Sequence, residues 1–351
     1  MLKQDTVYKK KDCLGLDIGA SSIKIVQLKQ KKHLTKLVGY QSRVLPENLV
    51  IEGIISDHAA MTKIVKEMMA ETKEGKFTAE KVIASIPDTN VFTRVLELPE
   101  LTEKEMKEAI AFEADQSIPM AITDLVIDWQ ILGPSATKEK TNDILMVAAP
   151  LAIVNSYIQL FNILGFQPEA IETSLTAVVR ALVSNKEKDE VIIVADIGAK
   201  KTNLGIYDNT LRFSDSVDFG GDMLTEAITS GLKVDKEKAE KMKKDLGLHD
   251  DKVKAEITPH LDNLKAEIVK VIRYHDERTG EERKIGKIIL CGGSSNVVGL
   301  TEYLANELKL EVKIGNPWVN IDTYPIKPVP KSESAAYTNA IGLSLRSLEE
   351  L

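Results

Sequence analysis

Two copies of the tetrapeptide DIGA, at residues 17–20 and 196–199, constrain the fold of this 351-residue chain more than any other feature. Each copy lies between two apolar runs, in LGLDIGASSIKIVQL and in IVADIGAKKTNLGIY. β-Branched residues on both sides of a glycine are typical of two strands joined by a tight turn. The four letters could recur by chance, but the shared strand–turn–strand pattern predicts one unit built twice.

The similarity continues after each turn. We expect a third strand near 33–44 in the first copy and over 210–219 in the second. Helices follow: 57–73, with Asp57 as N-cap, after the first copy, and a helix opened by Gly220-Gly221 after the second. The order predicts an α/β chain of two similar lobes.

Residues 79–168 have a different rhythm. We expect strands at 81–87, 91–99, 125–133 and 143–150, and a helix over 151–165 that Gly165 ends. A further helix begins at Thr102, where Glu105 three positions on completes a capping box, and Pro119 stops it. This order predicts a small α+β insertion.

Composition excludes several classes of protein. The chain is 43% hydrophobic and 28% charged, as in globular proteins, and its net charge of −7 argues against a nucleic-acid partner. Two cysteines, Cys13 and Cys291, give no disulfide framework or metal pattern and fit a reducing compartment. The N-terminal residues lack a signal-peptide core and no apolar run reaches membrane-spanning length. We therefore expect a cytoplasmic protein without direct membrane insertion.

The glycine turns suit an anionic ligand. Without a Cβ, backbone N–H groups can converge on phosphate, and a carboxylate at the strand end can hold hydrated Mg²⁺. Asp17 and Asp196 stand at those strand ends. The sequence contains no Walker loop, no G-x-G-x-x-G and no G-x-S-x-G, and its five histidines lack ligand spacing. Trp129 and Trp318 are interpreted as core or domain-edge aromatics.

Each of these features has an ordinary alternative. A single D-x-G turn is most often a hairpin, Lys24 a solvent-facing strand residue, and Gly292-Gly293 a plain strand-to-helix turn. Four such turns occur in this order, each at the end of a strand. It is much less favourable to interpret all four as ordinary structural turns.

The DIG turns, the GG–helix and CGGSSNVVGL together resemble the phosphate-1, phosphate-2 and adenosine motifs of the actin-like ATPase superfamily. SESAAYTNAIGLSL resembles its second connecting helix, and IETSLTAVVRAL, at 171–182, the first. Within the superfamily, residues 96–133 are similar to PilM, the type IV pilus assembly family, and the resemblance covers about 13–346. It implies the duplicated two-lobed ribonuclease H-like fold with an inserted α+β subdomain.

The resemblance assigns parts of the chain to subdomains. The first lobe takes 13–78, 169–188 and 332–351, and the insertion takes 79–168. The second lobe takes 189–221 and 286–331, with 222–285 as its outer helical part.

The resemblance also implies ATP and Mg²⁺ between the lobes. Asp17 and Asp196 would lie near the metal. The residues that it implies for the nucleotide are Gly19, Ala20, Ser21, Ser22, Lys24, Gly198, Ala199, Lys200, Thr202, Gly220, Gly221, Glu240, Lys243, Gly292, Gly293 and Ser294. For Glu240 and Lys243 an ordinary charged helix face is an equal alternative.

The chain departs from its relatives at two points. Lys200 and Lys201 stand where many relatives have Ser or Thr, so the second turn is expected to add fixed positive charge. No residue is a convincing hydrolytic base. Asp196 and Glu172 are the catalytic candidates; Glu172 could orient water, or be a plain loop acid. We expect slow ATPase activity at most.

For partners, the resemblance implies the cytoplasmic N-terminal segment of a PilN-like inner-membrane protein, received by the insertion, and other pilus platform and motor proteins. Self-association stays open, and the protein would be recruited to the cytoplasmic face of the inner membrane. An FtsA-like cell-division filament protein is one alternative. Its chains end in a basic amphipathic helix, whereas this sequence stops at SLRSLEEL. A small-molecule kinase is another, without an evident substrate motif.

Overall fold

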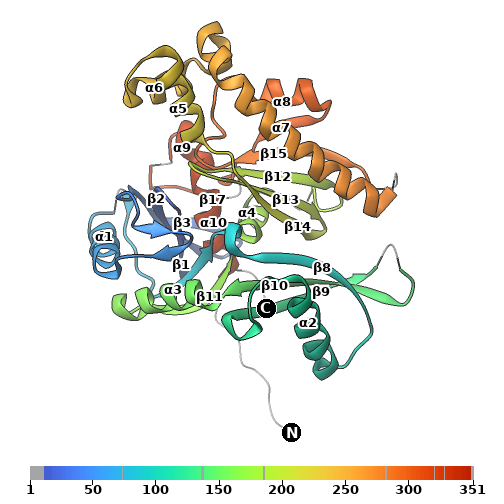
Figure 1. Ribbon diagram of the computed structural model, residues 1–351. Helices are drawn as coiled ribbons and strands as arrows, with labels where there is room; N and C mark the ends of the chain where they lie inside the picture. Colours follow the sequence, from blue (N-terminus) through green and yellow to red (C-terminus); the bar gives the residue numbers. More distant parts are fainter. Residues whose placement is uncertain are drawn as a thin grey trace.

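The computed structural model describes residues 12–348 except 73, 136–137, 185, 281–282, 320 and 328. Figure 1 shows two α/β lobes, one above the other, with a smaller unit of strands and one helix beside the lower lobe. Helices α4 (Ser174–Leu182) and α10 (Thr338–Arg346) lie between the two large sheets. The expected α/β fold of two similar lobes is confirmed.

The first lobe is built on a mixed sheet with strand order β11-β7-β1-β2-β3-β17, in which β6 also pairs with β3. Its strands are β1 (Cys13–Ile18), β2 (Ser22–Lys31), β3 (Leu34–Val44), β6 (Glu74–Gly75), β7 (Lys81–Ile86), β11 (Gln167–Thr173) and β17 (Ile321–Asp322). Alternate residues of β1, such as Leu14 and Leu16, face the core formed with α1 (His58–Ala70) and α3 (Leu151–Leu164). The opposite face of β1, which includes Gly15, faces α10.

The second lobe repeats this plan. Its sheet has the order β14-β13-β12-β15-β16, formed by β12 (Val191–Ile197), β13 (Thr202–Asp208), β14 (Thr210–Val217), β15 (Ile285–Cys291) and β16 (Glu311–Ile314). One face is covered by the helices α5 (Gly221–Leu232), α6 (Lys236–Asp245), α7 (Asp251–Thr279) and α8 (Leu300–Leu308). Leu175 and Val178 of α4 pack on the other face.

The smaller unit is a sheet of order β8-β10-β9 with one helix. It consists of β8 (Phe92–Pro99), α2 (Glu103–Ser117), β9 (Leu125–Pro134) and β10 (Thr141–Pro150). Met106, Ile110 and Ala114 of α2 pack on its sheet, and the predicted capping box of Thr102 and Glu105 is present. Short elements elsewhere are β4 (Val50–Ile51), β5 (Ile54–Ile55), η1 (Asp88–Asn90), η2 (Ile122–Asp124), η3 (Gly247–His249), α9 (Lys331–Ser334) and η5 (Ala335–Tyr337).

The sheet pairings differ from the expected boundaries of the insertion. The strand β7 pairs in parallel with β1 and is therefore part of the first sheet. The helix α3 packs in the core of the first lobe, against that sheet. Neither element belongs to the insertion. The helix α4, which was expected in the first lobe, contacts both lobes: Ala177 packs with Cys13 and Ile83 of the first sheet, and Leu175 packs on the second. Local patterns show that a strand or helix exists, but which sheet it joins depends on contacts that are distant in sequence.

Three further expectations on elements need adjustment. Residues 171–173 are the end of β11, so the first connecting helix begins only at Ser174. The charged stretch 235–277 is divided between α6 and α7. The helix after Gly292-Gly293 begins at Leu300, several residues beyond the turn. Trp129 and Trp318 are partly buried against apolar clusters, as expected.

Candidate functional site

The two DIGA turns have the same hydrogen bond. The N–H of Gly19 donates to the carbonyl oxygen of Ser22, and the N–H of Gly198 donates to that of Lys201, each at 2.9 Å. Each turn joins an antiparallel strand pair, β1 with β2 and β12 with β13. The sequence repeat is therefore a structural repeat, and each lobe has one such turn at the corresponding strand ends of its sheet.

Asp17 lies in a row of polar side chains that crosses the first sheet. The strand registers pair Asp17 with Lys24 of β2 and with Ser85 of β7, and Ser85 in turn with Glu172 of β11. Lys24 Nζ lies 3.5 Å from Asp17 Oδ2 and donates to Ser22 Oγ at 2.9 Å. Lys24 therefore faces the turn between β1 and β2, and its side chain is largely shielded from solvent.

Asn339 of α10 holds this row from above the sheet. Its Nδ2 donates to Asp17 Oδ1 at 2.9 Å and to Ser85 Oγ at 2.8 Å. These contacts fix the orientation of the Asp17 carboxylate from a residue more than 300 positions away. Asn339 was missed from the sequence, because its neighbour Thr338 and Ser344 of the same helix are polar too and nothing local distinguishes it.

Glu172, at the far end of the row, is engaged by two arginines. Its Oε1 accepts from Arg180 Nη1 at 2.6 Å, its Oε2 accepts from Arg180 Nη2 at 3.1 Å, and Arg346 also pairs with Oε2. The carboxylate is buried, and the ion pairs tie β11 to α4 and α10. Its two oxygens are thus already used in holding the connecting helices.

Asp196 lies against the third glycine turn. A Cβ on Gly292, whose φ is +84°, would overlap the Asp196 carboxylate and lie 2.8 Å from the carbonyl carbon of Ile197. Burial, together with the Asp17 carboxylate, raises the pKa of Asp196 to about 6, although Lys24 and a hydrogen bond with Cys291 act to lower it. The carboxylates of Asp17 and Asp196 are therefore close enough to influence one another electrostatically.

The glycine turns of the second lobe form one cluster. Gly221 N–H donates to the carbonyl of Gly198 at 3.0 Å, and Asp222 N–H to that of Ala199 at 2.8 Å. Ser294 N–H donates to the carbonyl of Ile197 at 3.0 Å. The structure thus brings together the predicted segments 198–199, 220–221 and 292–294.

Glu240 and Lys243 also join this cluster. Lys243 Nζ is buried and donates to the carbonyl of Gly221 at 2.9 Å, to Thr225 Oγ1 at 2.7 Å and to Glu240 Oε2 at 2.6 Å. Although burial opposes it, the hydrogen bonds from Lys243 and Thr225 lower the pKa of Glu240 to about 2. The pair is thus anchored to the Gly220-Gly221 turn, unlike an ordinary exposed helix face.

Other predicted residues are not brought to the site by their side chains. The Thr202 hydroxyl is buried and donates to the carbonyl of Phe219 at 2.9 Å. Lys201 pairs with Asp218, which neutralises part of the positive charge expected at the second turn. Lys200 is exposed. Ala20 and Gly293 are both exposed, and each could contact a ligand mainly through its backbone groups.

Another buried carboxylate, Asp88, was missed from the sequence. Its Oδ2 accepts from Leu175 N–H at 3.2 Å in the first turn of α4, and its Oδ1 accepts from Ser214 Oγ of β14 at 3.3 Å. Burial raises the pKa of Asp88 to about 7, with a contribution from Asp196. Nothing in the sequence around Asp88 distinguished it from an ordinary turn residue.

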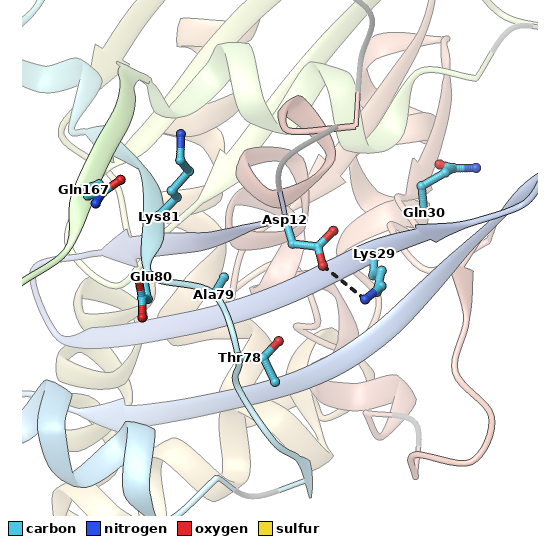
Figure 2. A pocket seen from close by; sticks show the side chains of 8 residues that line it. All are labelled: Asp12, Lys29, Gln30, Thr78, Ala79, Glu80, Lys81 and Gln167. Carbon is cyan, nitrogen blue, oxygen red and sulfur yellow. Dashed lines mark ion pairs between the residues drawn. The ribbon is translucent and has the colours of Figure 1, made fainter. Parts of the chain in front are cut away.

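A pocket of about 490 Å³ lies at the opposite end of the first sheet, where β1, β7 and β11 begin (Figure 2). Asp12 and Lys29 form an ion pair at its rim, 3.5 Å apart. Its other lining residues are Gln30, Thr78, Ala79, Glu80, Lys81 and Gln167, none of which the sequence predicted as functional. The turn at Gly19 lies at the other end of β1.

Comparisons with known proteins bear on both the fold and the family. A family model described as type IV pilus assembly protein PilM matches residues 15–348. The cell division protein FtsA of Streptococcus pneumoniae serotype 2 is 22% identical over 254 residues, which are 66% of this chain and 55% of that protein. The chain thus spans about half the length of this curated relative, and a smaller share of the FtsA of Neisseria meningitidis.

Solved structures agree with these matches. A PilM-PilN type IV pilus biogenesis complex superposes with a TM-score of 0.84 at 25% identity, covering 97% of this chain and 100% of that chain. MreB 5 of Spiroplasma citri bound to AMPPNP superposes with a TM-score of 0.56 at 12% identity, covering 96% of each chain. The second likeness shows the fold alone. No helix among the described residues has the length and apolar character needed to cross a membrane.

Proposed function

We propose that the chain, which belongs to the PilM family of type IV pilus assembly proteins, is an ATP-binding scaffold that binds the cytoplasmic N-terminal segment of a PilN-type inner-membrane protein. The observation that carries this proposal is the likeness over 97% of the chain to a PilM-PilN complex. In this account the protein works at the cytoplasmic face of the inner membrane because its partner holds it there.

The residues around the two turns fit a magnesium nucleotide. Asp17 and Asp196 repel one another, Lys24 offsets part of this repulsion, and a divalent cation would relieve more of it. Mg²⁺ bound with nucleotides commonly uses one or two carboxylates, water and phosphate oxygens. Accordingly, we propose that these two carboxylates hold the hydrated metal, and that Asn339 keeps Asp17 in position.

The glycine cluster suits the rest of the nucleotide. A Cβ on Gly221 would lie 2.9 Å from Ser294 Cβ and 3.2 Å from Lys243 Nζ, so only a glycine here lets these two side chains lie against the turn. We propose that the turns at Gly19–Ser22 and Gly198–Lys200 bind phosphates through N–H groups. Gly220, Gly221, Ser294, Glu240 and Lys243 would then surround the nucleoside.

Hydrolysis is not required of this site. Glu172 is paired on both oxygens with arginines, so its role in this proposal is to fasten the connecting helices. The main effect of ATP is then to stabilise the closed arrangement of the lobes by mass action. ATPase activity, where present, would be slow.

The insertion is the proposed receptor for the partner segment. Over residues 92–150 the chain has 11 acidic and 5 basic residues, so the insertion carries most of the net charge of −7. Its strand β9 ends the sheet and exposes Val126 and Ile131, and α2 exposes Phe112. An acidic surface with exposed apolar side chains favours a partner segment that is basic and partly apolar.

Calorimetric titration with the partner's N-terminal peptide, in the presence of Mg-ATP, tests the proposal. We expect saturable one-to-one binding, and no binding of a scrambled peptide. Ile131→Asp should weaken binding, whereas Leu34→Asp, in the first sheet, should not; the two side chains are 57% and 56% exposed, so they form a matched pair. Lack of binding by the wild-type chain with Mg-ATP present would refute the partner assignment.

A further inference from the structure

The inserted unit contacts the second lobe as well as the first. Three residues of β14 reach across: Arg212 Nη1 lies 2.7 Å from Asp143 Oδ2 of β10, while Ser214 Oγ donates to Asp88 at 3.3 Å and Ser216 Oγ is 3.0 Å from Thr89 Oγ1. Asp88 and Thr89 belong to η1, the turn between β7 and β8 that leads into the inserted unit. Figure 1 shows β14 directly above β8. We name these three contacts the β14 seam.

A fourth contact adds to the seam from α7. Arg278 Nη2 lies 3.8 Å from Glu97 Oε1 of β8, and the same guanidinium stands over the Tyr274 ring, 5.8 Å from its centroid. Both ion pairs therefore join acidic groups of the insertion to basic groups of the second lobe. Asp143 and Arg212 are mostly shielded from water, which makes their attraction stronger than that of an exposed pair.

The contacts of the seam are polar, whereas the cores of the insertion and of the second lobe are apolar. The cluster around Met106 and Ile144 fills the insertion, and that around Ile193 and Leu261 fills the second lobe; neither cluster includes residues of the other side. A cavity of about 100 Å³ lies at the seam, lined partly by Val95, Phe213 and Tyr274. Polar, incompletely packed contacts of this kind separate more easily than a shared apolar core.

The seam is also connected to the cluster of glycine turns in the second lobe. Ser216 lies only four residues before Gly220 along the chain, and Gly221 bonds directly to the DIGA turn at Gly198. In addition, Asp88 joins Ser214 to the first turn of α4, the helix that packs beside Cys291 and the second sheet. A shift of the 198–201 turn on binding phosphate would therefore move β14 relative to the insertion.

We propose that the β14 seam couples nucleotide occupancy between the lobes to the position of the inserted unit, and so sets its affinity for the partner segment. This inference rests on the proposed function, because it names the regulation of the same two sites. Coupling of this kind is reciprocal: if Mg-ATP raises the affinity for the partner segment, the segment raises the affinity for Mg-ATP by the same factor.

Hydrogen exchange on the full chain, with and without saturating Mg-ATP, tests the coupling. In the wild type we expect Mg-ATP to slow exchange of amides in β8 and β10 by at least about fivefold, a typical factor for coupled sites. Arg212→Glu should abolish this response, and the charge-reversed pair Arg212→Glu with Asp143→Arg should restore part of it. The matched control is Arg283→Glu, since Arg283 pairs with Asp208 inside the second lobe and its loss should leave the response unchanged.

The outcomes separate the inference from the proposed function. If calorimetry shows Mg-ATP binding but exchange in β8 and β10 is unchanged, or if Arg212→Glu responds as the wild type does, the inference is wrong and the proposed function stands. If a variant does not fold by circular dichroism, Arg212→Gln replaces it and the same loss of response is expected. If the wild type does not bind Mg-ATP, the proposed function fails, and the coupling fails with it.

Discussion

Gly342→Ala tests how the two connecting helices are held together. Gly342 of α10 faces the backbone of α4, and an added Cβ would lie 3.0 Å from Ala177 Cα and closer still to the Ala177 carbonyl group. Neither helix can yield easily, because α10 is also pressed against Gly15 of β1 and α4 is packed on the second sheet.

Two opposing effects set the magnitude of this prediction. Alanine is favoured over glycine inside a helix by about 1 kcal/mol. Overpacking of a dense contact costs about 1–3 kcal/mol and sometimes more, and a collision with backbone lies at the upper end. We therefore expect Gly342→Ala to lower the free energy of unfolding by about 2 kcal/mol net.

Urea denaturation followed by tryptophan fluorescence measures this loss, since one of the two tryptophans, Trp318, packs with Tyr40 and Tyr337 next to α10. Gly286→Ala is the control: Gly286 is exposed in β15, and the nearest heavy atom to its added Cβ is 3.8 Å away. Its effect should stay within about 0.5 kcal/mol. A Gly342→Ala variant as stable as the wild type would refute the close crossing of the helices.

Three further predictions concern the site and its supports. Gly221→Ala should weaken nucleotide binding at least about tenfold in a fluorescent-nucleotide titration, because its Cβ would displace the Ser294 and Lys243 side chains from their places against the turn. Arg180→Leu should lower stability by about 2 kcal/mol or more, measured by thermal unfolding, since it removes two hydrogen bonds from the buried Glu172 carboxylate. Burial raises the pKa of Asp88 to about 7, so the folded state binds this proton more tightly than the unfolded chain, and the wild type loses stability as the pH rises from about 4 to about 7. Asp88→Asn lacks this loss and should gain on the wild type by up to about 4 kcal/mol between those pH values in urea titrations; a constant difference between the two would contradict the assignment.

Local patterns in the sequence were enough to predict most elements and the site's backbone. The paired strand–turn–strand units, the N-cap of Asp57 and the capping box at Thr102 all depend on residues a few positions apart, and all are present. The glycines at 198, 220–221 and 292 could be predicted to matter because a backbone that must approach closely excludes a Cβ.

Features that depend on contacts between residues distant in sequence could not be predicted from local patterns. The strand at β7 has the same apolar pattern whichever sheet it joins, and only its pairing with β1 places it in the first lobe. Likewise, the partners of Asn339 and Arg212 are 322 and 69 positions away, so no local signal marks them. For the same reason, no local pattern could show that Arg346 pairs with Glu172, which lies 174 positions before it.

The measurement that tests the central claim most directly is calorimetric titration of the full chain with ATP, with and without Mg²⁺. The account predicts saturable ATP binding that strengthens when Mg²⁺ is present, and loss of that Mg²⁺ dependence in Asp196→Ala, whose circular dichroism should match the wild type. Binding of ATP to Asp196→Ala with the affinity and Mg²⁺ dependence of the wild type would remove the carboxylate from the site. Absence of ATP binding to the wild type would contradict the account as a whole.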